Sequence, residues 1–113
     1  MNPMKAKKRK KLKADGWRVG TASEFLDLTP EEEALIEMKL ALAEYLRKRR
    51  QREKLTQTQL AKLLGSSQSR VAKMEAADSA VSMDLLVRGL LVLGVSPKQV
   101  AKIIGAGVSQ KAA

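Results

Sequence analysis

Along most of the chain, apolar positions recur every three or four residues, and no segment alternates between apolar and polar with a period of two. The first spacing places apolar side chains on one face of a helix, whereas the second would indicate a half-buried strand. The pattern therefore predicts an all-α protein. The expected core consists of Leu42, Leu46, Leu55, Leu60, Leu64, Val71, Met74, Leu85, Leu90 and Leu93.

A long helix is predicted over residues 30–52, because three start signals precede its apolar pattern. Thr29 can cap the helix, Pro30 suits the first turn, and Glu32 completes a capping box. Its apolar face includes Leu35, Ile36, Leu42 and Leu46. A shorter helix is predicted before it, over residues 21–28.

Residues 55–77 have the spacing of two short helices packed across a tight turn. Thr56 starts the first helix with Gln59 as its capping-box partner, and Gly65 ends it because glycine takes a left-handed conformation at no steric cost. Ser67 starts the second helix, whose outward residues are polar: Gln68, Ser69, Arg70 and Lys73. Amides, a hydroxyl and cations on a rigid helix suit the DNA major groove. The alternative is an ordinary helical hairpin with a polar surface.

The last two helices are predicted over residues 83–93 and 97–104. Ser82 and Ser96 are their caps, and Gly105 is expected to end the second.

Composition excludes several classes of function. The 113-residue chain has no Cys and no His, so it has no thiolate site and lacks the commonest metal ligand and general base. Aromatic residues make up 3%, too few for platforms that stack single-stranded RNA. No apolar run approaches the roughly 20 residues of a membrane span, and no secretory signal is apparent. We expect a cytoplasmic protein that is not an enzyme and takes no metal, cofactor or small-molecule substrate.

The net charge of +10 is unevenly distributed. Residues 1–13 carry seven Lys or Arg and no acid, residues 24–44 carry seven acids against one Lys, and residues 45–73 carry nine Lys or Arg against one Glu. The last block coincides with the two-helix pattern, which indicates contacts with nucleic-acid phosphates.

These patterns divide the chain into four parts. Residues 1–16 form a basic tail that we expect to be disordered, either as a solubilising tail or as a nonspecific DNA arm. Residues 17–30 form an extension, residues 31–105 the helix-turn-helix domain, and residues 106–113 a second tail.

The stretch LTQTQLAKLLGSSQSRVAKME, followed by a loop and a Leu-rich helix ending in LG-V-SP, resembles the lambda-repressor-like (Xre) helix-turn-helix family. This resemblance spans roughly residues 42–104 and implies a five-helix DNA-binding domain, here with an N-terminal helical extension. The patches VGTASEFL and EEEALIEMKLAL are similar to the segment that precedes this domain in HigA-type antitoxins of bacterial toxin–antitoxin pairs.

The resemblance implies a role for each matching position. Base-reading positions are Gln57, Gln68, Ser69, Arg70 and Lys73. Positions near the phosphate backbone are Arg47, Arg50, Lys62, Ser66 and Ser67. Gln68 is the most specific reader, because its amide can bond N6 and N7 of adenine. For Gln57 either a phosphate or a base is in reach, and Arg70 reads guanine or contacts a phosphate.

The resemblance also implies an ion pair between Arg50 and Glu75, which would tie the first helix of the domain to the recognition helix. The chain departs from the family pattern at three places. Lys54 stands where the family frequently has Gly, Arg49 stands where it often has Leu or Ile, and the loop over residues 76–81 lacks the usual Gly.

By resemblance, the protein would be a transcriptional repressor that binds a palindromic operator as a homodimer. Val100, Ile103 and Ile104 would form the dimer contact, with a core role for them as the alternative. As a HigA-type antitoxin, the protein would neutralise a basic RNase toxin of the HigB/RelE kind and repress its own operon. Its expected toxin-binding residues are Trp17, Phe25, Leu28, Glu31 and Glu32.

Two other functions stay open. The protein could be a stand-alone Xre-family regulator without a toxin partner. In a different class, it could be an RNA- or ribosome-binding protein that acts through charge alone.

Overall fold

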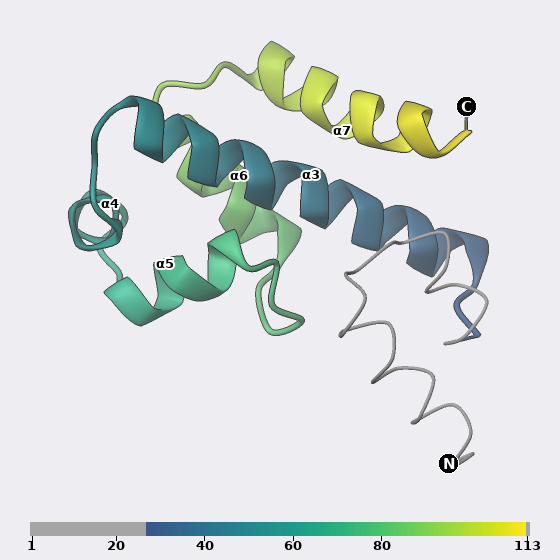
Figure 1. The fold of residues 1–113 in the computed structure, drawn as a ribbon, viewed down its shortest axis with the longest axis horizontal. Coiled ribbons are helices and arrows are strands. Elements are labelled where there is room, and N and C mark those ends of the chain that lie inside the picture. Colours follow the sequence, from purple (N-terminus) through teal and green to yellow (C-terminus); the bar gives the residue numbers. More distant parts are fainter. Residues whose placement is uncertain (1–26, 113) are drawn as a thin grey trace. The chain divides into compact units, whose positions relative to one another are not determined.

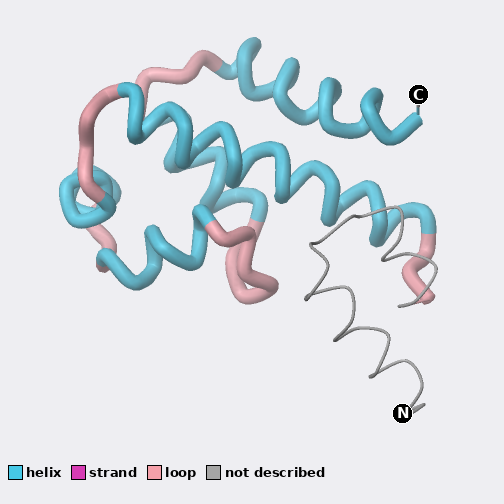
Figure 2. The backbone as a smooth tube through the Cα atoms, viewed as in Figure 1, coloured by secondary structure: helices cyan, strands magenta, loops and turns pink. Residues whose placement is uncertain are grey.

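The computed structural model describes residues 27–112 of the chain, with side chains described for residues 27–106. Within that range every regular element is a helix, which confirms the predicted all-α class (Figures 1 and 2). The helices are α3 (Pro30–Arg52), α4 (Gln57–Leu64), α5 (Gln68–Glu75), α6 (Met83–Val92) and α7 (Pro97–Ala112). The chain divides into two units between Glu37 and Met38, and α3 crosses this division.

In the first unit, the start of α3 is fixed by the predicted capping box. The backbone N–H of Glu32 donates to Thr29 Oγ1 at 3.1 Å, and the N–H of Thr29 donates to Glu32 Oε1 at 3.0 Å. Hydrogen bonds from its own backbone N–H and then from Thr29 lower the pKa of the exposed Glu31 carboxyl. Leu35 lies on the same face of α3 as Leu42 but is 49% exposed, so this end of the predicted apolar face is less buried than the end that carries Leu42 and Leu46. The helix predicted over residues 21–28 lies almost wholly outside the described residues.

In the second unit, α4 and α5 meet across a tight turn whose caps are those predicted. Thr56 Oγ1 accepts from the Gln59 N–H at 3.0 Å, and the Thr56 N–H donates to Gln59 Oε1 at 2.8 Å. Gly65 ends α4 in the left-handed conformation, with φ of 64°. Ser67 Oγ accepts from the Arg70 N–H at 3.2 Å and starts α5. Local signals therefore specify this pair of helices.

The buried apolar residues of the second unit form a single core, to which α4, α5, α6, α7 and the part of α3 after Glu37 all contribute. Figure 1 shows how these helices are arranged. Most of the predicted core residues are buried, while Leu55 and Leu85 are partly buried and pack against the core. The core also contains Val100 and Ile103, and further residues that the prediction did not include: Ala43, Ala61, Val81, Leu86 and Val95. Val100 and Ile103 are only 7% and 8% exposed, which agrees with the core role given as the alternative to a dimer contact, and Ile104 is partly buried.

The close packing of α6 against α3 and α5 depends on Gly89. A Cβ atom at this position would lie 3.0 Å from Met74 Cε and 3.3 Å from Leu46 Cδ1. The neighbouring Leu86 and Leu90 are fully buried on the same helix. Gly89 thus allows α6 to pack closely against the inner, apolar face of α5. The outer face of α5 stays exposed to solvent.

The end of α7 differs from the prediction. Gly105 does not stop the helix, which continues to Ala112. A glycine inside a helix costs about 1 kcal/mol relative to alanine, which weakens the helix without ending it. Among the described glycines, the left-handed conformation that ends a helix occurs at Gly65 and Gly94.

The departures from the family pattern have structural roles. Lys54 has φ of 59° in the turn before α4, and Ala77 has φ of 53° in the loop after α5, so both adopt the conformation that glycine favours. Arg49 Nη2 donates to the Leu93 carbonyl at the end of α6 (3.4 Å), and Arg49 Nε pairs with Glu53 at 3.1 Å. The arginine therefore joins α3 to α6.

Candidate nucleic-acid interface

The outer face of α5 is polar. Val71 and Met74 of this helix are fully buried, and the helical repeat places Ser69 and Lys73 on the opposite side. All predicted outward residues of α5 are exposed: Gln68, Ser69, Arg70 and Lys73. The structure therefore brings together, on one short helix, an amide, a hydroxyl and two cations.

At the start of α5, two serines lie beside each other. The hydroxyls of Ser67 and Ser69 are 3.2 Å apart, and Ser67 also caps the helix. A hydroxyl can rotate to donate or accept, so Ser69 suits several bases and is a weak determinant of sequence.

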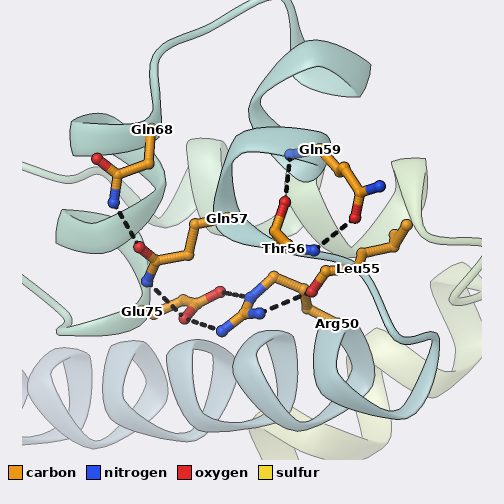
Figure 3. Close-up of polar contacts among 7 residues, drawn as sticks. All are labelled: Arg50, Leu55, Thr56, Gln57, Gln59, Gln68 and Glu75. Carbon is orange, nitrogen blue, oxygen red and sulfur yellow. Dashed lines mark hydrogen bonds and ion pairs between the residues drawn. The ribbon is translucent and has the colours of Figure 1, made fainter.

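Gln68 is connected to the interior of the domain by a chain of hydrogen bonds (Figure 3). Gln68 Nε2 donates to Gln57 Oε1 at 2.6 Å. Gln57 Nε2 in turn donates to Glu75 Oε1 at 3.1 Å. Both ends of the Gln57 amide are therefore engaged within the protein, whereas the family resemblance implies a contact of this amide with a base or a phosphate.

Arg50 and Glu75 form the ion pair that the family resemblance implies (Figure 3). Arg50 Nε and Nη2 donate to the two carboxylate oxygens, the second at 3.0 Å, and Nη1 donates to the Leu55 carbonyl at 2.8 Å. The side chains are 12% and 5% exposed, and the hydrogen bond to Glu75 raises the pKa of Arg50. Removing one partner of a fully buried pair typically costs about 3–5 kcal/mol, and this partly buried pair should cost less. The pair therefore anchors α5 to α3.

Most of the expected phosphate-binding residues are accessible. Arg47, Lys62, Ser66 and Ser67 are exposed. Arg50 differs, because its guanidinium is directed into the pair with Glu75. We therefore assign Arg50 to the scaffold of the interface and leave it out of the phosphate contacts.

Sequence reasoning missed the bond between Gln57 and Glu75. The two residues are 18 positions apart on different helices, and no spacing rule relates them. The one signal for it was the expected ion pair of Glu75, which places a carboxylate beside the inner face of the motif. A second missed contact is that of Lys39 Nζ, which donates to the Asp78 carbonyl at 3.1 Å and holds the loop after α5 against α3.

The residues expected to bind a toxin are described only in part. Leu28 is partly buried, and Glu31 and Glu32 are exposed at the start of α3. Trp17 and Phe25 lie outside the described residues.

Acidic side chains do not gather into a metal site in the described part of the chain. Within residues 27–112, no group of three or more Asp, Glu, His or Cys residues could hold a metal ion. No helix in the same range is long and apolar enough to cross a membrane.

Comparison with protein families matches residues 41–111, more than half of the chain, to the family described as a helix-turn-helix domain. The matched range contains the Arg50–Glu75 pair and every residue of the exposed face of α5. Comparison with curated proteins and with solved structures gives no match.

Proposed function

This chain belongs to the helix-turn-helix domain family, a family of DNA-binding regulators, and from that membership we propose that it is a sequence-specific transcriptional repressor. The observation that carries the proposal is the exposed polar face of α5, with Gln68, Ser69 and Lys73 on a helix whose other face is in the core. A helix with its side chains is about 10–12 Å wide, which matches the major groove of B-DNA.

In the proposed complex, α5 enters the major groove and its first residues meet base edges. Gln68 bonds N6 and N7 of adenine, and Ser69 contacts a neighbouring base. Lys73 and Arg70, further along the helix, contact guanine or a phosphate.

The phosphate backbone is held by residues around α5. Lys62 and Ser66 lie at the end of α4 and in the turn, and Arg47 lies on α3. Such contacts set the register and orientation of α5 without reading sequence.

One recognition helix reads too few base pairs to select a site in a genome. We therefore propose that two copies bind a palindromic operator, with half-sites about one helical turn apart.

The proposal is tested with duplexes that the wild-type protein selects from a random-sequence pool. Gln68→Ala and Ser69→Ala together should weaken binding to the selected duplex by about 1–3 kcal/mol for each good base contact that they remove, while binding to a scrambled duplex changes little. Affinities are measured by fluorescence anisotropy at fixed salt, because phosphate contacts depend on salt. An equal weakening on both duplexes would instead support a charge-driven nucleic-acid binder.

Within this class, we propose the more specific role of an antitoxin that represses its own operon and neutralises a basic RNase toxin. It is supported by the similarity of VGTASEFL and EEEALIEMKLAL to the corresponding segment of HigA-type antitoxins, and by the exposed acids Glu31 and Glu32, which can attract a cationic partner. A stand-alone regulator would need no such partner.

The antitoxin role is tested with the product of the neighbouring open reading frame. Deleting residues 1–28 leaves the Thr29–Glu32 capping box in place. This deletion should abolish rescue of cells from that product and leave operator binding intact. Rescue that survives the deletion would reject the antitoxin role and favour a stand-alone regulator.

A further inference from the structure

A groove lies between α3 and α7 in the second unit, and the proposed DNA-binding function does not use it. Its volume is about 380 Å³, and four residues from each helix line it. The lining positions run from Ala41 to Lys48 on α3 and from Gln99 to Ala106 on α7, with the spacing i, i+3, i+4 and i+7 on both helices. Each helix therefore presents one continuous face to the groove.

Burial gives the groove an apolar bottom and a polar rim. Ile103 is 8% exposed and belongs to the core, and the partly buried Ala41 and Tyr45 pack against that core. Lys48 and Lys102 are exposed at the edge. An apolar floor between two helices, with charged groups beside it, is the form of site that accepts the apolar face of an amphipathic helix.

The rim carries an unbalanced positive charge. Glu44 Oε1 pairs with Lys48 Nζ at 2.8 Å, so these two charges compensate each other. Within residues 27–106, no carboxylate pairs with Lys102. Lys98 lies one turn before Lys102, and residues 97–106 contain no acid. The groove therefore favours a partner that brings carboxylates to Lys102.

Two further polar groups of the groove are available for a partner. The backbone N–H of Gln99 donates to Ser96 Oγ at 3.1 Å, but its side-chain amide makes no hydrogen bond in the described part of the chain. The same is true of the Tyr45 hydroxyl. An amide and a hydroxyl can each donate and accept, so both can bond polar side chains of an incoming helix.

The groove is accessible while DNA is bound, because α7 lies on the other side of α3 from α4 and α5 (Figure 1). Its apolar bottom favours a protein segment over a nucleic acid, whose backbone presents phosphates and no apolar face. We propose that the groove docks an acidic amphipathic helix of a partner protein, with its apolar face on Ile103 and Ala41 and a carboxylate at Lys102. This partner differs in charge from the cationic toxin proposed for the start of α3.

The test uses a synthetic peptide stapled as a helix of about three turns, with leucines three and four residues apart and glutamates beside them. A companion peptide carries lysines in place of the glutamates. Binding of both peptides to the full chain is measured by fluorescence anisotropy at low salt, because exposed charges are screened at high salt. The wild-type protein should bind the acidic peptide about fivefold or more tighter than the basic one.

Lys102→Glu should reverse this preference, since it repels the acidic peptide and attracts the basic one. Arg88→Glu is the matched control, because it makes the same change of charge at an exposed position on α6 that does not line the groove. It should leave the ratio of the two affinities nearly unchanged. Ala106→Trp fills one end of the groove without a change of charge and should weaken both peptides. Thermal unfolding of each variant checks that the fold is retained.

Several results would overturn the inference. If neither peptide binds, or if Lys102→Glu and Arg88→Glu change the ratio equally, the groove is not a docking site. If a peptide with serines in place of the leucines binds as tightly, the site recognises charge alone and suits a nucleic acid better.

Two other results would assign a different occupant or a different surface. If sedimentation shows that the free chain is a dimer that Lys102→Glu dissociates, the occupant is a second copy. If a DNA duplex displaces the acidic peptide, the peptide lies on the face of α5 and not in the groove. Peptide binding is measured without DNA, so a failure of the proposed repressor function would leave the inference standing.

Discussion

At the scale of single residues, two side chains occupy backbone conformations that suit glycine. Lys54 (φ 59°) and Ala77 (φ 53°) are left-handed, a conformation that costs an L-residue roughly 1–2 kcal/mol. Ala77 also packs against the core, so its side chain stabilises the fold in part. Lys54 is exposed, so the strain at that position is not offset by burial.

We predict that Lys54→Gly raises the free energy of unfolding by about 0.5–1 kcal/mol, because glycine removes the strain and its own loss of chain entropy offsets part of the gain. Lys54→Ala is the control, since alanine removes the charge and keeps the strain. Urea denaturation of the two variants measures the difference. If Lys54→Gly and Lys54→Ala are equally stable, any change from the wild-type stability comes from loss of the lysine charge and not from relief of backbone strain.

At the scale of elements, glycine ends a helix only where the following residues complete a cap. After Gly94, the N–H of Val95 donates to the Leu90 carbonyl at 3.0 Å, and the Val95 side chain is 4% exposed. After Gly65, the N–H of Ser66 donates to the Ala61 carbonyl at 2.8 Å. Both glycines therefore complete C-terminal caps of the kind expected at helix ends.

We predict opposite effects for the same substitution at two glycines. Gly65→Ala should lower the free energy of unfolding by about 1 kcal/mol, because alanine is strained at a φ of 64°. No atom lies within 4 Å of the added Cβ, so this backbone strain is the whole cost. Gly105→Ala should raise the free energy of unfolding by about 0.8–1 kcal/mol, because the residue lies inside α7 with open space around it. Thermal unfolding measures both, and effects of the same sign would contradict the assigned conformations.

The helix starts could be predicted because their signals are local. Thr29, Thr56, Ser67, Ser82 and Ser96 all accept from a backbone N–H three residues on. The end of α7 could not be predicted in the same way, because Gly105 offers the same residue type as Gly65 and Gly94 but does not adopt their left-handed conformation.

In the candidate site, the exposed face of α5 could be predicted from local spacing, whereas contacts between distant helices could not. The exposed face of α5 follows from the spacing of Val71 and Met74, which a sequence pattern can reveal. The roles of Gln57 and Arg50 depend on contacts between helices distant in the chain, at separations of 18 and 25 residues from Glu75. The family resemblance implied a DNA contact for both residues and also the Arg50–Glu75 pair, but not the bond between Gln57 and Glu75.

At the scale of the whole molecule, the charge distribution should make DNA binding strongly dependent on salt. Residues 45–73 carry nine Lys or Arg against one Glu, and they contain α4, α5 and the end of α3. In the second unit, α7 lies on the other side of α3 from α4 and α5 (Figure 1). A cation on α7 is therefore far from the proposed DNA-binding face.

We predict that Lys62→Ala reduces the slope of log K against log salt concentration by about 0.9, the value of one phosphate contact on B-DNA. Lys102→Ala removes the same charge from an exposed position on α7 and should leave the slope unchanged. Titrations on one scrambled duplex at several salt concentrations measure both slopes. Equal reductions would mean that net charge alone governs binding.

The bond from Gln68 to Gln57 also limits how this scaffold can acquire a new operator preference. A switch to guanine at the contacted base would call for a side chain at position 68 that donates twice towards DNA. An arginine, with five N–H groups, or a lysine, with three, could donate twice towards DNA and still donate to Gln57 Oε1, whereas a side chain with fewer donors would leave that acceptor unfilled. On the proposed DNA-binding function, single substitutions that retarget position 68 to guanine are therefore limited to these two cations, and any other choice calls for a change at position 57 as well.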